Sequence, residues 1–130
     1  AVLCLLSIDS GLFNVKECRT RGIPLTNSET SEGVIDFHNK MKKLIEDYKV
    51  EVIAIKQRPT KGKFSGSANS FKMEAAIQLI EGVTVDLIAN TEIKETLKKN
   101  PLEYAMKDLE LRQFQEQAFN TAYTYALRSA

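Results

Sequence analysis

A polar segment in the middle of the chain, residues 56–73, carries residue types that can bind phosphate. It contains five basic residues and no acidic residue, whereas the whole chain is nearly balanced, with 18 basic and 17 acidic residues. Lysine and arginine bind nucleic-acid phosphates without reading the base sequence, and an aromatic ring can stack on a base. The candidate nucleic-acid-binding residues are Lys56, Arg58, Lys61, Lys63, Phe64 and Lys72.

The position of this segment favours the same chemistry. It follows an expected strand and leads into an expected helix, and ligands of α/β sheets gather beyond the carboxyl ends of strands. A helix start offers free N–H groups to phosphate, and Gly62 and Gly66 would let a polyanion backbone come close. The G-x-G-x-x-G and P-loop patterns are absent, which argues against a nucleotide-binding enzyme. The alternative interpretation is a solvated loop whose lysines serve solubility.

The hydrophobic pattern predicts the elements that must position this segment. Residues 1–8 form a continuous apolar run typical of a buried strand, the turn residues 9–11 follow, and residues 13–18 complete a hairpin. The order β-β-α-β-α-β-α-α predicts a single α/β domain over residues 1–130, a mixed sheet with helices on both faces. The later elements are a helix from Thr26 or one turn beyond to Tyr48, with Thr26–Glu29 as a capping box, a strand over 50–55, a helix over 70–81 ended by Gly82, a strand over 83–88, a helix over 90–99 capped by Asn90, and a terminal helix from about Leu109.

Composition sets the remaining bounds. A chain of 130 residues and 14.6 kDa is one ordinary domain. No apolar run approaches the ~18–20 residues of a membrane span, so we expect no membrane partner. Two cysteines, Cys4 and Cys18, are too few for a secreted disulfide scaffold, and no Cys/His cluster suggests zinc. We expect reduced thiols in a cytoplasmic protein, although a bridge stays open if the first two strands pair.

Two blocks of the sequence resemble RuvC-type Holliday-junction resolvases. Ala54-Ile55-Lys56-Gln57, then a loop and Ser67–Lys72, resembles their second conserved block, in which a strand ends in an acidic residue. Gln117–Tyr123 resembles their last block, in which two aspartates lie three apart on the final helix. The resemblance implies a ribonuclease H-like fold. The whole chain, particularly residues 58–64 and 72–78, is similar to a family of uncharacterised bacterial RuvC-like proteins that carry a domain of unknown function.

The same resemblance implies that the catalytic acids are degenerate. The resolvases hold two divalent metals with carboxylates, because the metals clamp the attacking and leaving oxygens. This chain has Lys56 at the mid-chain acid, and Gln117 and Asn120 on the final helix. We therefore expect no bound metal and a nucleic-acid-binding domain, with DNA or RNA as partner, that has lost catalysis. One alternative is a magnesium-dependent nuclease with displaced acids such as Glu74 and Glu116, and another is a structural or interaction homodimer.

The start of the chain also departs from the family pattern. The ribonuclease H-like fold has three strands before its first helix, and only two are predicted here. Asp9 resembles the first catalytic acid, but we interpret it as part of the hairpin turn. Residues 1–8 then correspond to the second strand, and the first strand is expected to precede Ala1.

The single histidine, His38, lies beside an apolar stripe and is interpreted as a structural or surface residue. Tyr123 and Tyr125 are expected to pack the last helix, with a dimer face as the alternative.

Overall fold

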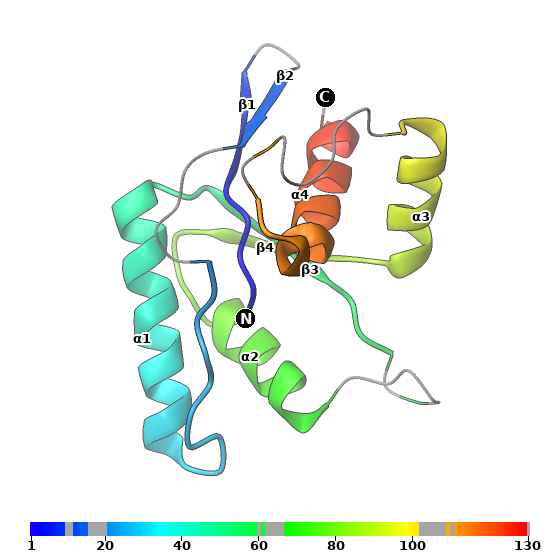
Figure 1. Ribbon diagram of the computed structural model, residues 1–130. Coiled ribbons are helices and arrows are strands. Elements are labelled where there is room, and N and C mark those ends of the chain that lie inside the picture. Colours follow the sequence, from blue (N-terminus) through cyan, green and yellow to red (C-terminus); the bar gives the residue numbers. More distant parts are fainter. Residues whose placement is uncertain are drawn as a thin grey trace.

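The strands form two separate ladders (Figure 1). The computed structural model describes residues 1–9, 12–15, 21–59, 61, 67–101, 109 and 111–129. Strand β1 (Leu6–Asp9) pairs antiparallel with β2 (Leu12–Val15), which confirms the predicted hairpin. Strand β3 (Val52–Lys56) pairs parallel with β4 (Thr84–Ile88), with Ile53 opposite Val85. The predicted α/β class with antiparallel and parallel pairs is confirmed, but no hydrogen-bonded ladder joins the two pairs within the described residues.

The first ladder begins later than the apolar run suggests. Residues 1–3 pair with residues 21–23 instead of standing inside β1: the Leu3 N–H donates to Arg21 O (2.8 Å) and the Ile23 N–H to Ala1 O (2.7 Å). Val2 forms an antiparallel bridge with Gly22. The chain before β1 is therefore held on one side by the chain that follows β2. Asp9 is the last residue of β1 and stands opposite Leu12, as expected for a residue at the hairpin turn.

The helices occupy the predicted stretches, with shifted bounds; the helix expected to end at Gly82 ends at Gln78, with Leu79 as its C-cap. Their bounds are α1 (Ser31–Tyr48), α2 (Ala68–Gln78), α3 (Asn90–Lys99) and α4 (Glu116–Ser129), and a short 3₁₀ helix, η2 (Gln113–Gln115), precedes α4. Asn90 is the first residue of α3 and not its cap, because Ala89 holds the cap position without a side-chain hydrogen bond. The terminal helix begins at Glu116 and not near Leu109. Before it, the buried Gln115 side chain donates to Leu3 O (2.8 Å) and accepts from the Arg112 N–H (2.9 Å).

The start of α1 is set by Thr30. Its hydroxyl accepts a hydrogen bond from the Gly33 N–H (3.0 Å), so the helix begins one turn after Thr26 and the predicted capping box does not form. The preceding residues form a turn in which Asn27 has a left-handed backbone (φ 52°). This turn lies directly against Gly33, where an added Cβ would stand 2.2 Å from Asn27 O. Only glycine fits at that contact.

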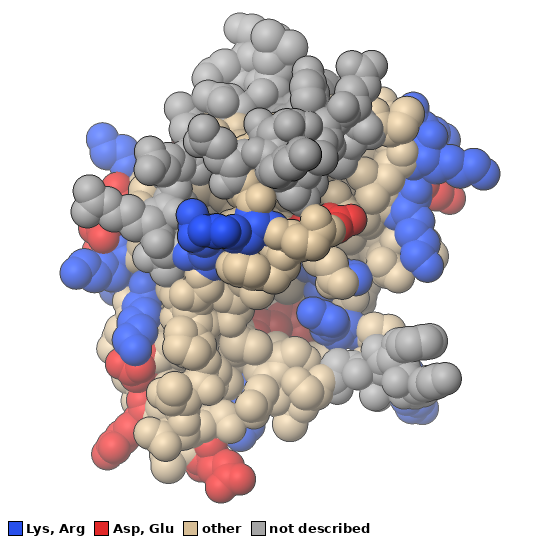
Figure 2. Space-filling view, viewed as in Figure 1, with Lys and Arg blue, Asp and Glu red and all other residues tan. Residues whose placement is uncertain are grey.

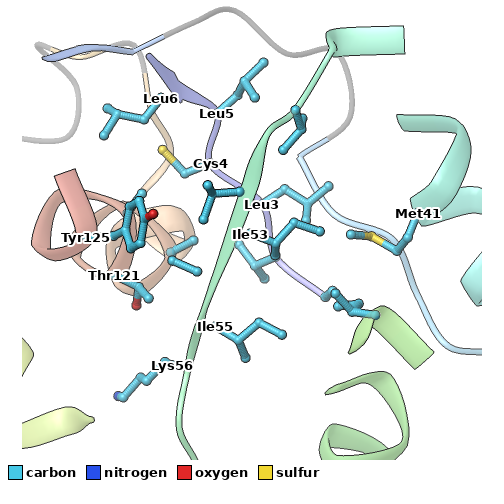
Figure 3. A pocket seen from close by; sticks show the side chains of 18 of the residues that line it. Leu3, Cys4, Leu5, Leu6, Met41, Ile53, Ile55, Lys56, Thr121 and Tyr125 are labelled. Carbon is cyan, nitrogen blue, oxygen red and sulfur yellow. The ribbon is translucent and has the colours of Figure 1, made fainter. Parts of the chain in front are cut away.

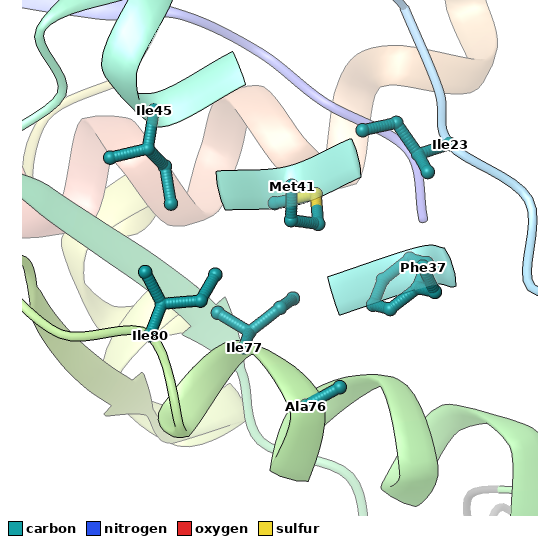
Figure 4. Close-up of a cluster of buried hydrophobic side chains, with 7 residues drawn as sticks. All are labelled: Ile23, Phe37, Met41, Ile45, Ala76, Ile77 and Ile80. Carbon is teal, nitrogen blue, oxygen red and sulfur yellow. The ribbon is translucent and has the colours of Figure 1, made fainter. Parts of the chain in front are cut away.

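Helices cover both faces of the strand layer. One apolar cluster joins α1 and α2 to the face of β3 that carries Ile53 and Ile55; its buried members are Ile23, Phe37, Met41, Ile45, Ala76, Ile77 and Ile80 (Figure 4). A second cluster, around Phe119 and Tyr123 of α4, packs on the other face against Cys4 and Leu6. The Phe119 and Tyr123 rings stack with centroids 5.7 Å apart, so Tyr123 packs the last helix as expected. Cys18 lies outside the described residues, and the open question of a Cys4–Cys18 bridge lies there too.

Candidate nucleic-acid interface

The end of β3 meets the start of α4. Successive side chains of a strand point to opposite faces, so Lys56 faces α4 whereas Ile55 faces the α1–α2 cluster. The Lys56 ammonium donates a hydrogen bond to Gln117 Oε1 (3.2 Å). Gln117 is the second residue of α4. Two positions that the sequence singled out, 61 residues apart, are thus in direct contact.

Positive charges gather around Lys56. Burial lowers the pKa of the Lys56 ammonium first, and the nearby charges of Arg58 and Lys94 lower the same pKa further. Lys94 lies on α3, which begins directly after β4. Because β3 and β4 are parallel, their carboxyl ends and the start of α3 lie at one edge of the sheet. We call Lys56, Arg58 and Lys94 the basic edge.

The structure brings together only part of the predicted binding set. Arg58 and Lys61 are exposed beyond the end of β3. Lys72, in the first half of α2, is exposed but donates to Ser28 O (2.6 Å), so it ties α2 to the turn before α1. Lys63 and Phe64 lie outside the described residues. In the space-filling view, Lys and Arg side chains cover α3 and border the hollow where β3 ends (Figure 2).

Lys94 is a member of the basic edge that sequence reasoning missed. Lys94 does not stand out in the sequence, because it lies 38 positions after Lys56 in a helix of mixed charge. A signal was nevertheless available. The predicted strand over residues 83–88 leads straight into that helix, and neighbouring parallel strands present their carboxyl ends together.

The donor groups at this edge do not suit a divalent metal. Magnesium prefers carboxylate and water oxygens, whereas the pair at the end of β3 is an ammonium and an amide. Asn120 offers an amide oxygen that is buried without a hydrogen-bond partner. Throughout the described part of the chain, no three His, Cys, Asp or Glu side chains are grouped so that they could hold a metal ion. Mg²⁺ clamped by carboxylates therefore has no fitting donor set among these residues.

The other candidate residues have identifiable surroundings. His38 Nδ1 donates to Ala76 O (2.7 Å), because a carbonyl can only accept, so His38 ties α1 to α2 as a structural residue. Glu116 is exposed and accepts a hydrogen bond from the Gln113 side-chain amide. Glu74 is half-buried and borders a groove that also reaches Lys56 and Glu116.

This groove opens beside Lys56. It has a volume of about 1180 Å³ and runs between the chain of residues 1–7 and β3, with helices on both sides (Figure 3). Apolar side chains of Leu3, Leu5 and Ile53 lie along it, and Lys56 lies at one end. Lys56 and Arg58 of the basic edge therefore line one end of a largely apolar groove.

Two solved structures share this fold. A structure of RuvC from Thermus thermophilus matches with a TM-score of 0.70 and 13% sequence identity, over 97% of this chain and 86% of that chain. A structure of T. thermophilus RuvC in complex with Holliday junction substrate matches with a TM-score of 0.64 and 16% identity, over 97% and 85% of the two chains. The fold is therefore the ribonuclease H-like fold of RuvC, as the two sequence blocks implied.

At the level of family the match is more specific. The chain belongs to the DUF3010 family of proteins of unknown function, whose family model matches residues 1–125. No curated protein sequence matches the chain. The relation to RuvC is one of fold, and the family shown is DUF3010, which confirms the expected unknown function of the family but not its assignment as RuvC-like. None of the described helices is both long enough and apolar enough to cross a membrane.

Proposed function

We propose that this protein binds the phosphates of DNA or RNA through the basic edge and the loop that follows it. The contact set is Lys56, Arg58 and Lys94, extended by Lys61, Lys63, Phe64 and Lys72. The observation that carries the proposal is electrostatic. Burial and then the charges of Arg58 and Lys94 lower the pKa of Lys56, and none of these three side chains forms an ion pair with another described residue.

Such a cluster costs free energy unless an anion binds there. Like charges at one edge repel each other, and a polyanion relieves this repulsion while it releases its own counterions. The Lys56–Gln117 hydrogen bond satisfies only one donor of the ammonium, which has three. Donors therefore remain for phosphate oxygens at the same place.

The proposal includes binding without metal-dependent cleavage. Hydrolysis of a phosphodiester by two metals needs carboxylates on both sides of the scissile phosphate. Lys56 and Gln117 supply no such group. The similar fold of T. thermophilus RuvC, whose solved complex holds Holliday junction substrate, makes a four-way junction the first probe to use. It does not make the junction the natural ligand.

The test is a titration of four labelled probes: a four-way junction, duplex DNA, single-stranded DNA and single-stranded RNA. Fluorescence anisotropy at two salt concentrations with magnesium gives affinity, and a denaturing gel of the same samples shows whether the probe is cut. We expect salt-sensitive binding and intact probes. The variant R58A/K94A should bind more weakly and lower the salt slope on duplex DNA by about 1.8, because each lost phosphate contact removes about 0.9.

A matched control removes the same charge elsewhere. Lys42 and Lys43 are exposed on α1, which packs on the opposite side of β3 from Lys56. K42A/K43A changes the net charge by the same amount as R58A/K94A and should leave affinity and salt slope nearly unchanged. Equal losses in both variants would contradict a localised site. Magnesium-dependent cleavage would contradict the loss of catalysis, and the absence of binding to all four probes would refute the proposed function.

A further inference from the structure

Phe114 is an exposed aromatic residue just before α4. It is the middle residue of η2 and its exposed fraction is 58%, whereas phenylalanine is commonly a core residue. Its exposed neighbours along the chain are polar, with Arg112 and Gln113 before it and Glu116 and Gln117 after it. Within residues 112–117, the ring is therefore presented singly among amide and charged groups.

The turn that presents this ring is anchored by hydrogen bonds. The next residue, Gln115, is buried; its side chain donates to Leu3 O (2.8 Å) and accepts from the Arg112 N–H (2.9 Å). On the outside of the same turn, the Gln113 side-chain amide donates to the Glu116 carboxylate. A phenyl side chain has only two rotatable bonds, so on an anchored backbone it loses little conformational freedom when a flat partner covers it.

Phe114 lies beside the Lys56 end of the basic edge. Glu116, which follows η2, has helical backbone angles (φ −55°, ψ −45°), so Phe114 and Gln117 are three apart along continuous helical backbone. Side chains three apart in a helix are neighbours, with about 5–6 Å between their Cβ atoms. Gln117 in turn accepts the hydrogen bond of the Lys56 ammonium (3.2 Å). One side chain thus separates the ring from the ammonium, and both border the same groove.

An exposed ring beside ammonium and guanidinium groups fits a nucleotide whose base is unpaired. Every base has a flat face that can stack on an aromatic ring while positive side chains hold the phosphates. In a duplex the faces of each base are covered by its neighbours in the stack, so only an unstacked base reaches the ring. Phosphate contacts alone bind a duplex as well as a single strand. The ring therefore adds a preference that the basic edge alone lacks.

A protein partner fits this place less well. Surfaces that dock proteins commonly include a contiguous apolar patch. The exposed side chains next to Phe114 in the chain are amides and charged groups, which remain hydrated beside a nucleic acid.

We infer that Phe114 stacks on an unpaired base, and that the interface therefore prefers single-stranded segments of DNA or RNA to duplex. This inference rests on the proposed function and deepens it, because it names the strand form that the interface takes. The ring of Phe114 covers one face of the base while Lys56 and Arg58 contact phosphates of the same strand. Stacking tolerates any base, so the preference is for strand form and not for sequence.

The first test uses tryptophan fluorescence, because the chain contains no tryptophan. F114W places one indole at the proposed contact, and a base that stacks on an indole quenches its emission. I35W is the matched control, since Ile35 is similarly exposed (56%) on α1, which packs on the opposite side of β3 from Lys56. We expect unlabelled single-stranded DNA and RNA to quench F114W and to leave I35W unchanged. Duplex DNA should bind F114W without quenching it.

The second test measures affinity by fluorescence anisotropy with F114L, which keeps an apolar side chain but removes the ring. We expect F114L to bind single strands at least about fivefold more weakly, because a stacked base is lost. Its affinity for duplex DNA should stay nearly unchanged. Its salt slope should also stay unchanged, because no charge is removed. F114W should bind single strands as tightly as the original protein.

The possible failures are distinguishable. Salt-sensitive binding of single strands with unchanged F114W emission would overturn this inference alone and leave the exposed ring for a protein partner. Equal losses of single-strand and duplex affinity in F114L would overturn it too, because they would give Phe114 a structural role. Equal quenching of I35W would show that the bases do not contact one place. If no probe binds at all, the proposed function fails together with this inference.

Discussion

Lys56 Nζ and Gln117 Oε1 lie 3.2 Å apart and join the last residue of β3 to the first turn of α4. The sequence segments around Lys56 and Gln117 resemble two conserved blocks of RuvC-type resolvases, in which acidic residues stand at these positions. Here the Lys56 ammonium donates a hydrogen bond to the side-chain amide oxygen of Gln117. The contact places a positive charge at the end of β3, and its charged neighbours are Arg58 and Lys94.

The lowered pKa of Lys56 makes stability depend on pH. In the unfolded chain, Lys56 titrates near its ordinary value of 10.5, and in the folded protein it titrates lower. Between these two values the unfolded state binds more protons, so the Lys56 contribution to the free energy of unfolding rises with pH. We predict that K56M removes this rise. Urea unfolding of both proteins from neutral pH to pH 10.5 measures the difference, in which contributions of other groups largely cancel.

The direction in which the stability difference between K56M and the original protein changes with pH tests the cause. The stability of K56M relative to the original protein should be greatest at neutral pH and should fall as the pH approaches 10.5. A pH-independent difference would mean that neither burial nor the charges of Arg58 and Lys94 lower the pKa of Lys56. A difference that grows with pH would mean that an acidic partner holds the ammonium.

Removal of magnesium should not weaken nucleic-acid binding. The Lys56–Gln117 pair and the buried Asn120 amide oxygen offer a divalent ion no carboxylate, so the proposed phosphate contacts use ammonium and guanidinium groups alone. We predict the same affinity with magnesium as with EDTA when the ionic strength is matched. Anisotropy with the best-bound probe measures this. A clear loss of affinity in EDTA, restored by magnesium, would show that an ion bridges protein and phosphate.

Much of the fold could be predicted because local patterns decide it. The β-branched run before Lys56 and the apolar stripe of α1 are local signals, and both elements lie where they were expected. The first residue of a helix was harder to predict from the sequence, because several neighbouring side chains can each serve as the N-cap. Thr26 and Thr30 both fit a cap by sequence, and the close approach of the Asn27 turn to Gly33 favours Thr30.

The site was predictable only in part, for a related reason. Lys56 and Arg58 stood out because they share a segment without acids. Lys94 comes from a helix that also carries Glu92 and Glu95, and only the parallel pairing of β3 with β4 brings it to Lys56. The contact of Lys72 with Ser28 O was equally hidden, since it depends on how α2 packs beside the turn before α1.

The two threonines before α1 give a direct test of the helix start. T30A removes the side chain that accepts the Gly33 N–H, and we predict a loss of about 1 kcal/mol in the free energy of unfolding. T26A is the matched control, because it deletes the same atoms from an exposed residue outside the cap and should cost much less. Urea denaturation of the three proteins provides the measurement. Equal costs, or a larger cost for T26A, would place the helix start at Thr26 and contradict the structure.

Arg128 near the end of α4 should make stability depend on acidic pH. Its guanidinium donates to Glu92 Oε1 (2.9 Å) and Asp86 Oδ2 (3.1 Å), and so joins α4 to α3 and β4. The hydrogen bond from Arg128 lowers the pKa of the Glu92 carboxyl below 4.5. A carboxyl with a lowered pKa contributes stability that is present above its unfolded value and is lost as the pH falls through its folded value.

We therefore predict that R128A has a lower melting temperature than the original protein at neutral pH. The gap between the two should narrow below pH 4.5 and close as the pH falls through the lowered pKa of Glu92, because below that pKa Glu92 is protonated with or without Arg128. Thermal unfolding followed by circular dichroism from pH 7 to pH 3 measures this gap. K40A is the control, because Lys40 pairs with Asp36 within α1 alone and joins no two elements. A gap that persists unchanged at pH 3 would assign the effect of Arg128 to packing of its side chain and not to its charge.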